Sequence, residues 1–92
     1  MKINLIKNSD EGRYEAHVEG QLAFVDYKEK EGKVYLVHTE VPKELEGKGV
    51  AGKLVEKVLQ DIKADVKKVV PRCSYVATYI KKHPEWERLV AE

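Results

Sequence analysis

The stretch Val-Pro-Lys-Glu-Leu-Glu-Gly-Lys-Gly-Val-Ala-Gly-Lys-Leu-Val, residues 41–55, decides how this chain folds. Three glycines, Gly47, Gly49 and Gly52, crowd the start of a helix that the apolar spacing predicts from Val50 onward. The first N–H groups of a helix have no partner inside it, and the helix dipole favours negative charge there. Because glycine also lets a ligand approach the backbone closely, the stretch predicts a phosphate-binding turn.

Alternating segments surround this turn and predict the rest of the fold. Four strands are expected before it, at residues 2–7, 13–19, 21–28 and 33–41. Their short connections favour an antiparallel meander. A helix over residues 50–66 then leads to a short fifth strand at residues 67–71, and such a crossover predicts that this strand lies parallel to the fourth. Residues 73–82 and a short segment opened by Pro84 predict C-terminal helices, which makes the fold a mixed α+β one.

Length and composition narrow the classes of function. The 92 residues suit a single domain over residues 1–92, and a net charge of +1 argues against a dedicated nucleic-acid binder. The single cysteine, Cys73, allows no intramolecular disulfide and fits a reducing cytosol. Residues 1–25 do not resemble a secretory signal, and no apolar run approaches the roughly 20 residues of a membrane helix. We expect a soluble, cytoplasmic monomer or weak dimer without membrane or nucleic-acid partners.

Two common phosphate-binding patterns match the glycine turn but fail on context. Residues 47–52 satisfy the dinucleotide pattern G-x-G-x-x-G, yet five residues separate Val41 from the first glycine. Lysines also stand where that pattern needs an acid, about 20 residues on. Residues 47–53 satisfy the P-loop pattern G-x-x-x-x-G-K, but Leu54 replaces the hydroxyl side chain that holds magnesium. The sequence therefore disfavours both interpretations of the turn as a nucleotide-binding loop.

The string V-x-x-x-x-x-G-x-G-V-A that starts at Val41 resembles the acetyl-CoA-binding motif of the GNAT acyltransferases, roughly [QR]-x-x-G-x-[GA]. Gly49 and Ala51 match the later positions, whereas Glu46 departs from the first. The resemblance implies that the pyrophosphate of acetyl-CoA lies on the backbone of this turn, where Lys48 and Lys53 offset the negative charge of Glu46. The implied donor-binding residues of the turn are Glu46, Gly47, Lys48, Gly49, Val50, Ala51, Gly52 and Lys53.

Four stretches in order resemble the minimal GNAT-like group: residues 38–42, 47–50, 70–76 and 79–86. The resemblance implies a GNAT-like fold and acetyl-CoA as the donor. It also implies that the end of the fourth strand, Thr39, Glu40 and Val41, grips the pantetheine arm, with Ser74 close by. The group lacks the first helices and last strands that shape the acceptor pocket in larger members. The acceptor, an amine or a protein, is therefore not implied.

Cys73 is the first candidate for acyl-transfer chemistry. It lies at a predicted helix start beside Arg72, and both features favour the thiolate, so it could take the acetyl group as an enzyme thioester. The alternative is a buried small hydrophobic residue. His38 lies on the strand expected to face the donor and could be a general base, or a hydrogen-bonded histidine that fixes the strand end.

Tyr79 matches the tyrosine that, in larger GNAT members, protonates the leaving CoA thiolate, and its alternative is core packing. Glu40 is either a further base or a solvated glutamate. Three scattered histidines and one cysteine lack the spacing of a metal site, so no metal is expected. The sequence thus favours an acetyl-CoA-dependent acyltransferase, and the alternative is a non-catalytic CoA-binding or interaction module.

Overall fold

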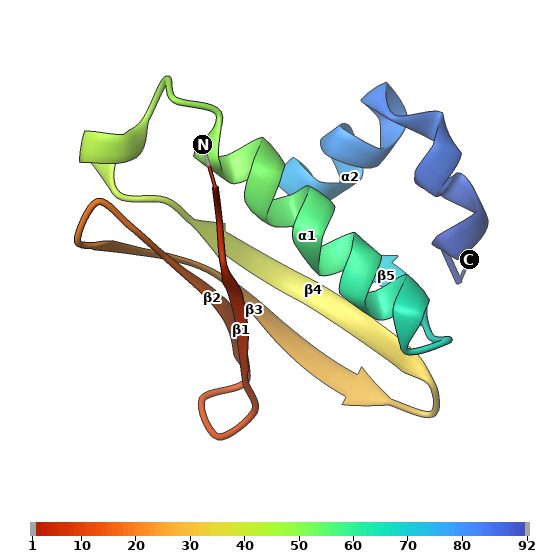
Figure 1. Ribbon diagram of the computed structural model, residues 1–92. Helices are drawn as coiled ribbons and strands as arrows, with labels where there is room; N and C mark the ends of the chain where they lie inside the picture. The colour runs from red at the N-terminus through yellow and green to blue at the C-terminus, as the bar shows by residue number, and fades with distance from the viewer. Residues whose placement is uncertain (1, 92) are drawn as a thin grey trace.

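The computed structural model describes residues 2–91 and begins with an antiparallel meander (Figure 1). Its strands are β1 (Leu5–Asn8), β2 (Arg13–Val18), β3 (Gln21–Lys30) and β4 (Lys33–Glu40), each paired antiparallel with the next. Helix α1 (Val50–Ala64) then leads to β5 (Lys68–Pro71), which pairs parallel with β4. The sheet order β1-β2-β3-β4-β5 confirms the predicted α+β topology.

The helical elements lie on one side of this sheet (Figure 1). They are α1, α2 (Ser74–Lys82) and the 3₁₀ segment η2 (Pro84–Leu89), with a short 3₁₀ turn η1 (Lys43–Leu45) before α1. The end of the chain returns to β5, where the Ala91 N–H donates to the Val69 carbonyl at 2.9 Å. Within residues 2–91 the other face of the sheet carries no helix, and no helix there is long and apolar enough to cross a membrane.

The core fills the space between α1 and the sheet. The buried side of α1 consists of Val50, Leu54, Val55, Val58, Leu59 and Ile62. These side chains form one cluster with the inner face of the strands and with Val76 and Ile80 of α2. Full burial of one such side chain contributes about 1.5–3 kcal/mol, so this stripe fixes α1 on the sheet. The Tyr14 hydroxyl also donates to Asp61 Oδ2 at 3.2 Å and ties β2 to α1.

The end of α1 differs from the predicted helix over residues 50–66. The helix stops at Ala64, and Val66, with a φ of 57°, is 91% exposed. The Lys67 N–H donates to the Ile62 carbonyl and the Val66 N–H to the Lys63 carbonyl, which is the Schellman pattern. The apolar spacing suggested Val66 as a core residue, but this left-handed cap places it in solvent.

Other element boundaries in the structure also differ from the predicted ones. The first strand begins at Leu5 rather than at residue 2, although Ile3 is buried, and the segment after Pro84 is a 3₁₀ helix. The turn η1 was not predicted, because three residues carry too little periodicity to reveal it.

A β-bulge in β4 decides which of its side chains face the helices. Asp26 of β3 pairs with His38, but Tyr27 pairs with Leu36, so Val37 has no partner on β3. Leu36 faces the core, and the extra residue shifts the alternation by one position. Thr39, opposite the buried Val25, therefore faces the helices, while His38 faces the uncovered side of the sheet.

Candidate functional site

The glycine turn forms the first part of the site. Gly49 is the N-cap of α1 with a φ of 75°, and no side chain caps the helix. A pocket of about 250 Å³ lies between the first turn of α1, Val41 just after β4, and Tyr75 on α2. The first N–H groups of α1 have no carbonyl partner within the helix, so this end offers hydrogen-bond donors to an anion.

Both acidic and basic side chains surround the glycine turn. Glu46 lines the pocket, and its role in donor binding stays a prediction. Lys48 pairs with Glu19 at 2.8 Å, and Lys53 pairs with Glu56 at 3.4 Å. Because these are exposed pairs, each contributes little and can open to a ligand at small cost.

Cys73 lies where α2 begins. Its N–H donates to the Leu36 carbonyl at 2.8 Å, and its Sγ lies 3.4 Å from the Thr39 hydroxyl. Burial raises the pKa of the thiol, but hydrogen bonds from the Thr39 hydroxyl and from the backbone of Val76, Tyr75 and Thr39 outweigh it. The net pKa of Cys73 is therefore below that of an ordinary thiol, which favours the thiolate.

The two parallel strands separate next to this cysteine. Their last pair is Leu36 with Pro71, where β5 ends, whereas β4 continues to Glu40. In the part of the chain that the structure describes, residues 37–40 have no strand beside them on this edge. An extended ligand arm could therefore lie along β4, with Thr39 and Cys73 at its inner end and Ser74 exposed at the start of α2.

The structure does not bring His38 to Cys73. The His38 Nε2 lies 2.9 Å from Glu40 Oε1, on the face of the sheet opposite Thr39, and both side chains are more than half exposed. The ring of Phe24 lies beside His38, with centroids 6.4 Å apart. This pair is thus separate from the thiol, and its role as a base stays a prediction.

Comparison with known proteins shows the family of the chain. The family model for "GCN5-related N-acetyl-transferase" matches residues 13–89. The chain belongs to the GCN5-related N-acetyltransferase family. Its fold is similar to the solution structure of a "GCN5-like putative N-acetyltransferase" from Staphylococcus aureus, with a TM-score of 0.73 and 21% sequence identity. The match covers 95% of this chain and 86% of the other, and at this identity it shows the fold alone.

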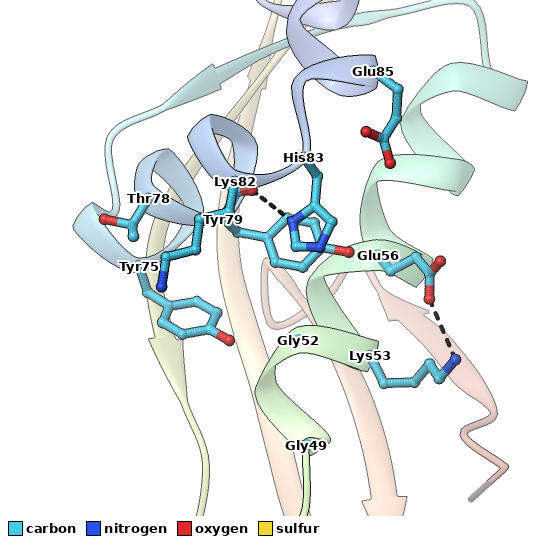
Figure 2. A pocket seen from close by; sticks show the side chains of 10 residues that line it. All are labelled: Gly49, Gly52, Lys53, Glu56, Tyr75, Thr78, Tyr79, Lys82, His83 and Glu85. Carbon is cyan, nitrogen blue, oxygen red and sulfur yellow. Dashed lines mark hydrogen bonds and ion pairs between the residues drawn. The ribbon is translucent and has the colours of Figure 1, made fainter.

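In this N-acetyltransferase family member, Tyr79 lies away from the thiol. Six positions along α2 separate it from Cys73, a rise of about 9 Å in an α-helix. The Tyr79 ring stacks on His83 with centroids 4.0 Å apart, and His83 Nδ1 donates to the Tyr79 carbonyl at 2.9 Å. Tyr79 lines a second pocket, of about 430 Å³, on the other side of the glycine turn (Figure 2). Its role as a general acid stays a prediction.

Sequence reasoning singled out Tyr79 but missed its polar neighbours Tyr75, Lys82 and His83 in this second pocket. Tyr75, Tyr79 and His83 follow one another at intervals of four, which is the spacing of one helix face, and Lys82 lies beside them. That spacing was the available signal, but the apolar residues among them suggested core packing. Within residues 2–91 no group of three His, Cys, Asp or Glu side chains could hold a metal ion.

Arg72 was expected to add positive charge beside the thiol. The structure places its guanidinium over the Tyr35 ring, with the carbon 5.8 Å from the ring centroid. Hydrogen bonds from Thr39, Val76 and Tyr75 lower the pKa of Cys73 against the effect of burial.

Proposed function

We propose that this protein is an acetyl-CoA-dependent acyltransferase in which Cys73 carries the acetyl group between donor and acceptor. The observation that carries this proposal is the contact between Cys73 Sγ and the Thr39 hydroxyl, at the point where β4 and β5 separate. A thiol with a lowered pKa at the point where two strands separate has the character of a nucleophile.

The residues present fit the donor. The turn at residues 47–52 offers backbone N–H groups to a pyrophosphate, and glycine at positions 47 and 49 adopts the positive φ values that shape the turn. The smaller pocket runs from this turn to Val41. From there the unpaired edge of β4 leads past Glu40 and Thr39 to Cys73, a path that suits the pantetheine arm.

The proposed chemistry has two steps, and both balance without another cofactor. The Cys73 thiolate attacks the thioester carbonyl carbon, and the bond from that carbon to the CoA sulfur breaks with its electron pair going to sulfur, which takes up a proton. The acceptor amine then attacks the Cys73 thioester, loses a proton, and releases the Cys73 thiolate. The backbone groups of Tyr75 and Val76 that stabilise the thiolate serve in both steps.

We infer that the acceptor approaches from the uncovered face of the sheet, where His38 and Glu40 lie, and reaches the Cys73 thioester past the edge of β4 that β5 leaves unpaired. There His38, held by Glu40, would take the proton that the amine loses in the second step. This arrangement assigns the two faces of β4 to the two substrates. A His38→Gln variant should then form the acetylated Cys73 at the normal rate but pass the acetyl group on more slowly.

Calorimetry and mass spectrometry together test the proposal. Wild-type protein should bind acetyl-CoA and gain one acetyl group on Cys73, with release of free CoA. Cys73→Ala should still bind the donor but gain no acetyl group, which makes it the control for labelling elsewhere. Absence of any binding heat at millimolar acetyl-CoA would overturn the proposed donor.

One observation favours a second candidate, a non-catalytic CoA-binding module. Cys73 is only 9% exposed, and the face assigned to the acceptor carries no helix in the described residues to enclose a substrate. Tight binding of acetyl-CoA without acetylated Cys73 and without CoA release would favour this candidate over the enzyme. Competition of NAD or ATP against CoA tests the disfavoured nucleotide-binding alternative in the same titration.

Localisation in a reducing cytoplasm, a single domain, and a monomer or weak dimer stay predictions. The lone cysteine supports the first, since a free thiol with a lowered pKa is preserved under reducing conditions. Sedimentation of the purified chain with and without acetyl-CoA would measure the oligomeric state.

A further inference from the structure

The Thr39 hydroxyl lies between the thiol and the proposed path of the donor. Its Oγ1 is 3.4 Å from Cys73 Sγ, and Thr39 belongs to the part of β4 that continues beyond the last pair with β5. Among residues 2–91 this contact is the hydroxyl's only hydrogen bond. A hydroxyl has one hydrogen to donate, so it serves one acceptor at a time. The Thr39 hydroxyl is therefore a single donor that can be redirected to a second acceptor.

Acyl transfer brings a second sulfur next to the same hydroxyl. When the Cys73 thiolate attacks the thioester, its sulfur and the CoA sulfur are both bonded to one carbon. Negative charge then passes from the Cys73 sulfur to the CoA sulfur. The branched Cβ of threonine restricts where Oγ1 can lie, while the O–H bond is free to rotate. A donor held in this way can follow the charge without any rearrangement of the protein.

Tyr79 is the rival candidate for stabilising the leaving sulfur, and its position is less favourable. It lies six positions along α2 from Cys73, a rise of about 9 Å, and its ring stacks on His83. Burial and the nearby charges of Glu56 and Glu85 raise the pKa of Tyr79, which makes its hydroxyl a weaker acid. The Thr39 hydroxyl, by contrast, already contacts the reacting sulfur.

We propose that Thr39 is a catalytic residue whose hydroxyl moves its hydrogen bond from the Cys73 sulfur to the CoA sulfur during acetyl transfer. The inference rests on the proposed function, in which Cys73 takes the acetyl group from acetyl-CoA. The electron pair of the thiolate forms the new bond to the carbonyl carbon, and the pair of the broken bond goes to the CoA sulfur. The hydroxyl hydrogen stays on Oγ1 throughout, and the CoA thiolate then takes its proton from water. When the acceptor displaces the Cys73 sulfur, the hydroxyl returns to it.

Two reactions of Cys73 separate this role from the effect of Thr39 on the thiol itself. Iodoacetamide and acetyl-CoA both react with the Cys73 thiolate, but only acetyl-CoA releases a thiolate that needs a hydrogen-bond donor. Both rates are measured on Thr39→Val by mass spectrometry, at saturating reagent and at alkaline pH, where the thiol is fully ionised. The ratio of acetylation to alkylation should fall about tenfold from the wild-type value, as loss of one charge-assisted hydrogen bond implies.

A second variant and a second donor identify the group that is lost. Thr39→Ser keeps the hydroxyl and should retain the wild-type ratio. S-phenyl thioacetate carries the same acetyl group on an aromatic thiol of low pKa, which leaves more readily than CoA. Thr39→Val should therefore react with this donor almost as fast as the wild type does.

The outcomes separate this inference from the function on which it rests. If acetyl-CoA does not acetylate wild-type Cys73, the proposed function is wrong and the inference fails with it. If the wild type is acetylated and Thr39→Val keeps the same ratio, the function stands and the role of Thr39 is wrong. Equal slowing of Thr39→Val with acetyl-CoA and S-phenyl thioacetate would also overturn the role, because the loss would not depend on the leaving sulfur. A loss specific to acetyl-CoA in Tyr79→Phe, and not in Thr39→Val, would assign the role to Tyr79 instead.

Discussion

Replacing Thr39 by valine removes one hydroxyl from the site and keeps the shape of the side chain. In the wild type that hydroxyl lies 3.4 Å from Cys73 Sγ and lowers the pKa of the thiol. A hydrogen bond at this long separation contributes about 1 kcal/mol, which corresponds to about fivefold in the ratio of thiolate to thiol. Thr39→Val should therefore raise the pKa of Cys73 and slow its reaction at neutral pH by about fivefold.

The assay is the rate of alkylation by iodoacetamide, followed by mass spectrometry from acid to alkaline pH. Cys73 is the only cysteine, so the label is unambiguous. The two rates should converge at high pH, where both thiols are ionised, and this plateau corrects for any change in access. Thr39→Ser retains the hydroxyl and should follow the wild type, and Thr78→Val, at an exposed position of α2, controls for the substitution itself. A Thr39→Val profile that coincides with the wild type, or lies at lower pH, would refute the reasoning.

Three further predictions concern stability and binding. Gly49→Ala places a side chain at a φ of 75°, so thermal melts should show the free energy of unfolding lowered by about 1 kcal/mol, and CoA binding should weaken. Gly20→Ala, at a φ of 76°, is the control and should lose as much stability without a change in CoA binding. Val66→Gly should raise the free energy of unfolding in urea by about 1 kcal/mol, because it removes the backbone strain of a valine in the left-handed conformation. An unchanged free energy of unfolding would show that Val66 is not strained. Burial and Asp61 raise the pKa of Tyr14 far above 10.0, so its contribution to stability is complete below pH 10 and is lost as the pH rises beyond it. Tyr14→Phe should give a flatter decline of stability above pH 10, and an unchanged slope would exclude Tyr14 as its source.

The strand order could be predicted because local patterns and chain connectivity agreed. Short turns between alternating segments required an antiparallel meander, and the crossover through α1 required a parallel β5. The helix start at Val50 followed from the glycines before it and the apolar stripe after it. The end at Ala64 did not follow, because a valine in the left-handed conformation breaks the usual preference for glycine.

The site was predictable where it depends on position along the chain. The placement of Cys73 at the start of α2 and of glycines at the start of α1 can be read from element boundaries. The faces of β4 could not be read in this way. Simple alternation puts His38 on the same face as Leu36, and only the pairing with β3 reveals the unpaired Val37 that reverses this.

The bulge at Val37 also determines which kinds of mutation this chain can tolerate during evolution. Substitutions at His38 and Glu40 change a solvated face and leave the packing of α1 untouched, so they should cost little in folding. Deletion of the single residue Val37 would remove the bulge and leave the two faces as they are, because Leu36, His38 and Thr39 would then alternate regularly opposite Tyr27, Asp26 and Val25. The strand can therefore change side chains on its uncovered face, or lose the extra residue, without turning Thr39 away from Cys73.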